Sequence, residues 1–300
     1  MGVQYQVSNL DAVSPKHSFI FILGKSKMLS VRFQEAVSPR ASLLRSIITI
    51  VAIGLIINKA HPLMAKESEN WLGFRGNGTS ASSSAPSAMK MGAGGNVAWK
   101  VPMPGKSVAG PIVVGDLVIS TSSGGQEGEQ LFITAVSLET GEKRWEQSFR
   151  ATGRPFCHPT SANAAPSPVS DGERIFAFYS SNDLVCLSLE GDLLWYRGLG
   201  FDYPKAGNDI GMASSPIIAD GAIIAQVEAQ GDSFAIGIDV ATGTNLWRMA
   251  RPRQSNWSSP VAIDRPDESV EVVMQSGNNI VAVDPRRGNV KWMIEEGADK

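Results

Sequence analysis

The sequence predicts an all-β fold built from repeated four-stranded sheets, and three observations support this class. A Gly-x-x-x-Trp pattern occurs five times, and its Trp residues lie 46, 50, 52 and 45 residues apart. Alternating apolar segments and turns that contain Gly lie between the copies, as in hairpins. The composition agrees, because 30 Gly and 17 Pro in 300 residues suit a protein with many turns better than a helix bundle.

The Gly-x-x-x-Trp pattern is expected to end each repeat and to join it to its neighbour. A large indole ring in an outer strand can fill the gap between two stacked sheets. The Gly has no Cβ, so it allows both a tight turn and the close approach of that neighbour. The docking residues are Gly95, Trp99, Gly141, Trp145, Gly191, Trp195, Gly243, Trp247, Gly288 and Trp292.

A Gly-Pro or Ser-Pro pair begins each repeat and leads into an Asp/Gly turn between two apolar segments. The four pairs are Gly110-Pro111, Ser167-Pro168, Ser215-Pro216 and Ser259-Pro260. Each unit therefore reads as strand, turn, strand, loop, strand, Gly turn, and a strand that ends in Trp. Four short strands in such a period are typical of a β-propeller blade, and blades stack because one blade cannot bury both of its faces.

These docking residues, together with the opening Trp71-x-x-Phe-Arg-Gly76 pattern, resemble the repeats of pyrroloquinoline quinone (PQQ)-type propellers. That superfamily includes quinoprotein alcohol dehydrogenases and the lipoprotein of the outer-membrane β-barrel assembly machine. The opening pattern is similar to PQQ-like repeat proteins of planctomycete bacteria. The resemblance implies a ring with more blades than the roughly four that residues 96–300 supply. We therefore expect an incomplete ring with uncovered end faces, and a small propeller is the alternative.

The amino-terminal part of the chain predicts an export signal. Residues 46–57 are apolar and uncharged, Arg45 precedes them, and small residues lead to a cleavage point after Ala65. The apolar run is shorter than the roughly 20 residues of a membrane-spanning helix. The expected divisions are residues 1–27, a non-native or disordered leader that ends before a start at Met28; 28–65, a signal peptide or uncleaved signal anchor; 66–95, an anchor and Gly/Ser linker; and 96–300, the blades.

Three long connections follow docking Trp residues, at residues 147–166, 196–215 and 248–259. Loops of this length on a regular scaffold commonly carry binding residues, although ordinary solvated loops are the alternative. The first and third connections are net positive, so they suit an anionic ligand or an acidic segment of a partner. The candidate binding residues are Arg154, His158, Tyr203, Asn208, Asp209, Arg251, Arg253 and Trp257.

The charge of the chain and its few Cys and His residues argue against several classes of function. The chain has 27 Lys+Arg against 29 Asp+Glu, which argues against a nucleic-acid binder. Two Cys and three His leave little material for a metal centre, and the neighbours Cys157 and His158 rarely form a catalytic pair, so we assign no catalytic or metal-binding residue. A disulfide between Cys157 and Cys186 is one possibility, because an exported protein can be oxidised, and the alternative is two free thiols.

We therefore expect an exported, non-catalytic binding or scaffold module of the periplasm or cell envelope. Its partner would be a protein or a glycan on the long-loop face, and it would touch the membrane only through an uncleaved segment at residues 46–57. One alternative is a PQQ- and calcium-dependent oxidoreductase, which the resemblance implies, with Asn208 and Asp209 on a suitable loop for a calcium ligand or base. The chain lacks the Cys-Cys pair typical of those enzymes. The second alternative is an incomplete propeller fragment with no independent function.

Overall fold

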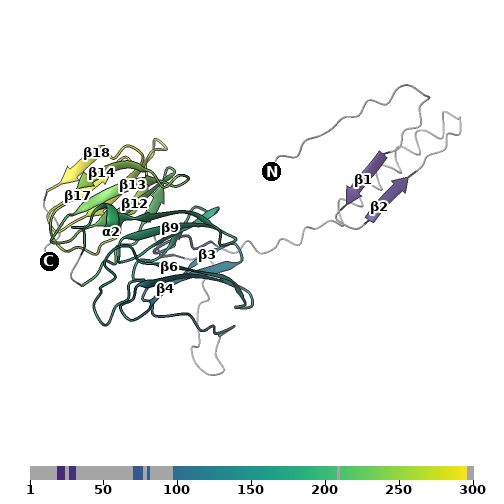
Figure 1. Ribbon diagram of the computed structural model, residues 1–300. Coiled ribbons are helices and arrows are strands. Elements are labelled where there is room, and N and C mark those ends of the chain that lie inside the picture. The colour runs from purple at the N-terminus through teal and green to yellow at the C-terminus, as the bar shows by residue number, and fades with distance from the viewer. Residues whose placement is uncertain are drawn as a thin grey trace. The chain divides into compact units, whose positions relative to one another are not determined.

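A computed structural model describes residues 19–23, 27–31, 70–76, 80–81, 97–207 and 210–295 (Figure 1). The chain forms two units, Met1–Ala65 and Lys66–Lys300. In the first unit, β1 (Phe19–Leu23) and β2 (Lys27–Val31) form an antiparallel hairpin that spans the boundary expected at residue 27. The apolar run at 46–57 and the expected cleavage point lie outside the described residues. Within the described part of the chain, no helix is long and apolar enough to cross a membrane.

The second unit consists of four antiparallel sheets of four strands each, which we call blades 1 to 4. Blade 1 holds β3 (Ile112–Val114), β4 (Leu117–Gly124), β5 (Gln130–Ser137) and β6 (Lys143–Arg150). Blade 2 holds β7 (Val169–Ser170), β8 (Arg174–Phe178), β9 (Asp183–Ser188) and β10 (Leu193–Gly198), followed by a short helix, α2 (Leu199–Asp202). Blade 3 holds β11 (Ile217–Ala219), β12 (Ala222–Val227), β13 (Phe234–Asp239) and β14 (Asn245–Ala250). Blade 4 holds β15 (Val261–Asp264), β16 (Val270–Gln275), β17 (Ile280–Val283) and β18 (Val290–Ile294).

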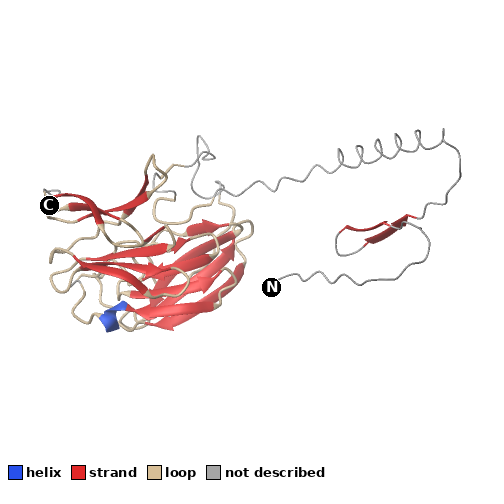
Figure 2. Ribbon diagram, turned by 90° about the horizontal axis from the view of Figure 1, so that it is seen from above, coloured by secondary structure: helices blue, strands red, loops and turns tan. Residues whose placement is uncertain are grey.

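The blades stack as the repeat pattern predicts. In every sheet the strands follow chain order, and the first strands of consecutive sheets lie next to one another. The sheets pack face on face in Figure 2. The prediction of an all-β propeller with about four blades is therefore confirmed, and the described sheets do not close into a ring.

We call the contact between two neighbouring blades a seam. Successive apolar side chains of a strand point to opposite faces of its sheet, and they form the hydrophobic cores of the seams on the two sides. In β8, Ile175 packs toward blade 1, whereas its neighbour Phe176 packs toward blade 3. Both side chains are fully buried. Since successive residues of a strand point to opposite faces, a central blade contributes to two cores, and its strands read as nearly continuous apolar runs.

The docking tryptophans join consecutive blades as the sequence predicts. Trp145 of blade 1 donates its indole N–H to the carbonyl of Leu189 in blade 2, at 2.8 Å. Its ring covers Gly191, where φ is +92° and a Cβ would lie 2.7 Å from the indole Cδ2. The same pairing of an indole donor, a carbonyl and a covered Gly recurs at three other places: Trp99 with Leu138 and Gly141, Trp195 with Val240 and Gly243, and Trp247 with Pro285 and Gly288.

The last docking tryptophan differs from the others. Trp292 donates its indole N–H to the carboxylate of Glu271 in its own blade, at 2.8 Å, and Arg265 binds the same oxygen at 2.6 Å. On this face of blade 4, Ile263 and Ile294 are exposed, and no described residue covers them. This matches the uncovered end face that we expected. Gly95 lies outside the described residues.

The Ser-Pro pairs form a second link across each seam, which the sequence did not predict. The serine hydroxyl of one blade accepts a hydrogen bond from the main-chain N–H at the matching position of the preceding blade. Gly110 donates to Ser167 at 3.1 Å, Ser167 to Ser215 at 3.0 Å, and Ser215 to Ser259 at 2.9 Å. This serine ladder joins the beginnings of the first strands, whereas the tryptophans join the outer strands.

Residues 70–73, which we call the strap, dock beside the first strands of blades 1 and 2. Trp71 and Val113 of β3 exchange two main-chain hydrogen bonds of 2.9 Å each. The next residue, Leu72, accepts a hydrogen bond of 2.8 Å from the N–H of Ser170 in β7. The strap therefore lies between two first strands and bonds to both.

Candidate binding face

The long connections between blades lie at one end of the sheets. Each leads from the fourth strand of one blade to the first strand of the next, and they share that end with the loops between second and third strands. They cover residues 151–168, 199–216 and 251–260, and we call the surface that they form the long-loop face. The outer strands extend to Arg150, Gly198 and Ala250, so the first connection begins four residues later than the sequence indicated and the other two begin three residues later.

Two hydrogen bonds fasten the three connections to one another. The N–H of His158 in the first donates to the carbonyl of Ile210 in the second, at 3.0 Å. The indole of Trp257 in the third donates to the carbonyl of Gly211, at 2.9 Å. Gly211 has a φ of +92°, and a Cβ there would lie 2.9 Å from the Cβ of Cys157. Gly therefore allows the first and second connections to meet, and the three form one continuous surface.

This surface presents apolar and cationic side chains together. Trp257 is 42% exposed and Ile210 is 46% exposed, although each is anchored by a hydrogen bond. Phe156 is also exposed, and the guanidinium of Arg154 lies 4.9 Å from the centre of its ring. Lys106 reaches the same loop, where its ammonium donates to the carbonyl of Pro159 at 2.7 Å. Aromatic and guanidinium groups held in this way are common anchors of protein interfaces.

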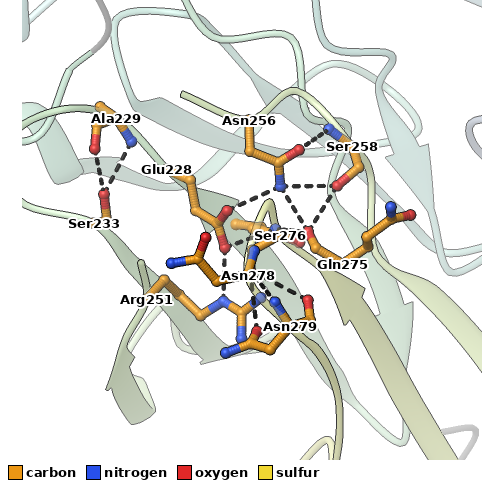
Figure 3. A network of polar contacts seen from close by, with 11 residues as sticks. Glu228, Ala229, Ser233, Arg251, Asn256, Ser258, Gln275, Ser276, Asn278 and Asn279 are labelled. Atoms are coloured by element: carbon orange, nitrogen blue, oxygen red, sulfur yellow. Dashed lines mark hydrogen bonds and ion pairs between the residues drawn. The ribbon is translucent and has the colours of Figure 1, made fainter. Parts of the chain in front are cut away.

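Arg251 does not belong to the exposed surface, in contrast to the expectation from the sequence. Its side chain is 2% exposed and pairs with the fully buried Glu228, with 2.7 Å between Nε and Oε1 (Figure 3). A carboxylate and a guanidinium removed from water need each other, because an unpaired charge there is costly. Within the described residues, the Nη2 atom of Arg251 has no hydrogen-bond partner.

The same polar network fixes the third connection to blade 4. The amide of Asn256 donates to the other oxygen of Glu228 at 2.9 Å and to the carbonyl of Gln275 at 2.6 Å. The hydroxyl of Ser258 also donates to the carbonyl of Gln275, at 2.8 Å. Figure 3 shows these groups converging from blades 3 and 4. Trp257 therefore stands between two anchored residues, which orders the main chain that carries its exposed ring.

The other candidate residues are divided between the face and the blades. Tyr203 packs into blade 3, with its ring 4.8 Å from that of Phe234 and its hydroxyl bound by Asn245 at 3.1 Å. Arg253 is 74% exposed and lies 3.9 Å from the carboxylate of Asp232. Asn208 and Asp209 lie outside the described residues. The structure thus leaves Arg154, His158, Arg253 and Trp257 exposed on the connections of the long-loop face. The side chains of Tyr203 and Arg251 instead point into the blades.

A second buried carboxylate, which sequence reasoning missed, holds the first connection in place. Asp183 is fully buried and accepts hydrogen bonds from the hydroxyls of Thr152, Ser181 and Tyr196, at 2.5, 2.6 and 2.9 Å. The main-chain N–H of Thr152 also donates to it. Burial, together with the charge of Asp183, raises the pKa of Tyr196 well above its ordinary value. No motif marks this group, because its donors come from separate strands and loops.

Neither cysteine is activated. Cys157 and Cys186 are both free, so the disulfide that the sequence left open is not formed. Burial raises the pKa of Cys186 to about 12 and also raises that of Cys157, whereas a reactive cysteine has a lowered pKa. Among the residues that the structure describes, no group of three or more His, Cys, Asp or Glu side chains is placed to hold a metal ion.

The four stacked blades, joined by docking tryptophans, define a β-propeller protein of PQQ-like repeats. The sequence comparison identifies the family within this class. The chain belongs to the family described as "Outer membrane protein assembly factor BamB", whose model matches residues 68–211 and 132–300. A search of curated protein sequences finds no match.

Two solved structures show similar folds at low sequence identity. One is the crystal structure of BamB from Moraxella catarrhalis, with 17% identity, a TM-score of 0.45, and coverage of 66% of this chain and 54% of that one. Another is a europium-containing methanol dehydrogenase, with 13% identity, a TM-score of 0.45, and coverage of 63% and 41%. The chain therefore spans about half the length of the structures that it matches.

Proposed function

We propose that this chain is a non-catalytic binding module of the cell envelope that holds a protein partner on its long-loop face. The observation that carries the proposal is the fastening of three connections, by His158 to Ile210 and by Trp257 to Gly211, into one surface with exposed aromatic side chains. The description of the family as an outer-membrane protein assembly factor supports a protein as the partner. Export to the envelope follows from the signal expected at residues 28–65.

The chemistry of the face indicates what the partner presents. Trp257, Ile210 and Phe156 offer apolar contact area. Hydrogen bonds already hold the main chain of Ile210 and the indole of Trp257, so these two residues lose little entropy on binding. Arg154 and Lys106 add positive charge at the edge of this area. A partner segment with apolar side chains flanked by carboxylates would complement both features.

Site-specific photo-crosslinking in the native host tests this proposal. The photoreactive residue p-benzoylphenylalanine replaces Phe156 or Ile210 on the face, and Glu190 or Ala241 in exposed turns at the opposite end of the sheets as controls. We expect one protein adduct of defined mass from the two positions on the face and none from the two controls. Trp257→Ala, placed in the same chains, should weaken the interaction on the order of thirtyfold and remove that adduct.

Two results would contradict the proposal. Equal adducts from both ends of the sheets would show contact without a specific face. An adduct whose added mass is removed by glycosidases, and whose protease digest contains no peptides of a second protein, would identify a glycan in place of a protein. A Trp257→Phe chain is the matched control, because it keeps an aromatic ring at the same place and loses only part of the contact area and the indole donor.

A further inference from the structure

The strap shows how the first strands of two neighbouring blades can bind an extended segment. The main-chain N–H and carbonyl of Trp71 both hydrogen-bond to Val113 of β3, and the carbonyl of the next residue, Leu72, accepts a hydrogen bond from the N–H of Ser170 in β7. This alternation is what an extended chain provides, since the polar groups of successive residues point to opposite sides. One short segment therefore satisfies the edges of two blades at once.

The first strands of blades 3 and 4 offer the same edge. Ile218 pairs with Ile223 in β11–β12 in the register that Val113 and Val118 adopt in β3–β4. In both hairpins this pair is one step beyond the pair that closes the two-residue turn, so the polar groups of Ile218 point away from its own sheet, as those of Val113 do. In blade 4, Ala262 takes the corresponding place in β15. No described residue hydrogen-bonds to the main chain of Ile218 or Ala262 on this side.

The serine ladder sets the same offset between the two pairs of strands. The N–H of Gly110 reaches Ser167 at 3.1 Å, and the N–H of Ser215 reaches Ser259 at 2.9 Å. In each strand the ladder residue precedes the edge residue by the same number of positions, as Gly110 precedes Val113 and Ser215 precedes Ile218. A segment that fits between β3 and β7 therefore meets matching donors and acceptors between β11 and β15.

We propose that the facing edges of β11 and β15 bind an extended polypeptide segment of a partner protein by strand addition. The strap indicates its sequence pattern, which is Asn, an aromatic residue, an aliphatic residue and Gly. The side chain of Asn70 accepts the N–H of Gly115 in the β3–β4 turn at 2.9 Å, and the β11–β12 turn offers the N–H of Asp220 at that place. A Cβ on Gly73 would lie 3.1 Å from Val169, and Val261 follows Pro260 as Val169 follows Pro168. A small residue therefore fits best at the fourth position.

This site is separate from the long-loop face, so either proposal can fail without the other. Main-chain recognition gives affinity in strand addition, and the side-chain positions give specificity. The short length of β11 and β15 limits the segment to a few residues, as it does for the strap. We therefore expect binding that depends on main-chain N–H groups more than on any single side chain.

A labelled synthetic peptide with the sequence of residues 68–76, SENWLGFRG, provides the probe, and fluorescence anisotropy with the full chain provides the measurement. We expect saturable one-to-one binding. Ile218→Pro removes the N–H that points to the peptide and leaves the ladder within the sheet intact, so it should weaken binding about tenfold or more. Ile218→Ala is the matched control, because it loses more of the packing side chain and keeps the N–H, and it should bind the peptide normally.

N-methylated peptides test the strand addition even if the Ile218→Pro chain does not fold. Methylation of the peptide nitrogen at Trp removes the donor that Trp71 uses with Val113, and it should weaken binding about tenfold or more. Methylation at the Phe nitrogen should have no effect, since the N–H of Phe74 makes no main-chain hydrogen bond to a described residue. The proposal is overturned if the full chain shows no saturable binding, if both methylated peptides bind alike, or if a folded Ile218→Pro chain binds normally.

Discussion

Replacing Gly191 with Ala tests the docking seam, and Gly172 in the same blade supplies a matched control. The two glycines have φ values of +92° and +91°. A Cβ on Gly191 would lie 2.7 Å from Cδ2 of Trp145, whereas a Cβ on Gly172 would meet nothing within 4 Å. The two substitutions therefore share the backbone strain and differ in the contact with the indole ring.

The structure gives the size of each contribution to the free energy of unfolding. A side chain in the left-handed region costs about 1–2 kcal/mol at either position. At Gly191 the ring must also move, and overpacking of this kind costs about 1–3 kcal/mol. Movement of the ring weakens the 2.8 Å hydrogen bond from Trp145 to Leu189, which contributes about 1 kcal/mol. Gly191→Ala should therefore destabilise the chain by about 2–4 kcal/mol more than Gly172→Ala.

Urea unfolding of the full chain, followed by tryptophan fluorescence and circular dichroism, measures this difference. Coincident transitions by the two probes would justify comparison of the unfolding free energies. If the two substitutions destabilise the chain equally, within about 0.5 kcal/mol, the indole contact does not hold the seam together.

Three further predictions follow from the buried and charged groups. Arg251→Met leaves the carboxylate of Glu228 buried without its cation and should lower the unfolding free energy by about 3–5 kcal/mol, whereas the exposed Arg253→Met should change it by less than about 1 kcal/mol; an equal effect in urea unfolding would refute the role of the pair. Cys186 has a pKa raised to about 12, so at pH 8 its thiol should react with iodoacetamide only after unfolding, and rapid labelling of the native chain, read by mass spectrometry, would contradict its burial. The hydrogen bond from Arg265, followed by that from Trp292, lowers the pKa of Glu271 below its ordinary value of 4.5. The stabilising contacts of Glu271 are therefore present above pH 4.5 and are lost as the pH falls through the lowered pKa. A pH titration of the tryptophan fluorescence of the unmodified chain should show a step with a midpoint below 4.5, and Glu271→Gln should abolish that step.

The repeat made the blades predictable, because the docking residues recur at nearly constant spacing and each has one local role. Gly141 and Trp145 mark a turn and an outer strand in the sequence, and they have those places in the structure. The partner of each Trp follows from the stacking of blades in chain order. The Ser-Pro pairs were visible as a repeated motif, but the ladder was not, since a hydroxyl can accept a bond from many places and only the stacked arrangement selects one.

The candidate face was only partly predictable, because loop residues receive their environment from distant parts of the chain. The sequence around Arg251 indicates an exposed cation in a loop. In the structure, its ion pair with Glu228, 23 residues earlier, holds the side chain in the seam. Asp183 carries no motif, and its burial depends on Thr152, which lies 31 residues before it. Trp257 was correctly assigned to a long connection, but the sequence does not show that its indole binds Gly211. Such pairings depend on how the blades meet, which local patterns do not encode.

We propose that the stacked blades form a folded scaffold that binds a protein rather than a cofactor. One thermal melt of the full chain tests this proposal most directly. The melt is recorded by circular dichroism with and without PQQ plus calcium. Because the seams join the four blades into one unit, we expect a single cooperative transition whose midpoint does not change when PQQ and calcium are added. A midpoint that rises with their concentration would show that the native state binds the cofactor, and it would contradict the non-catalytic assignment.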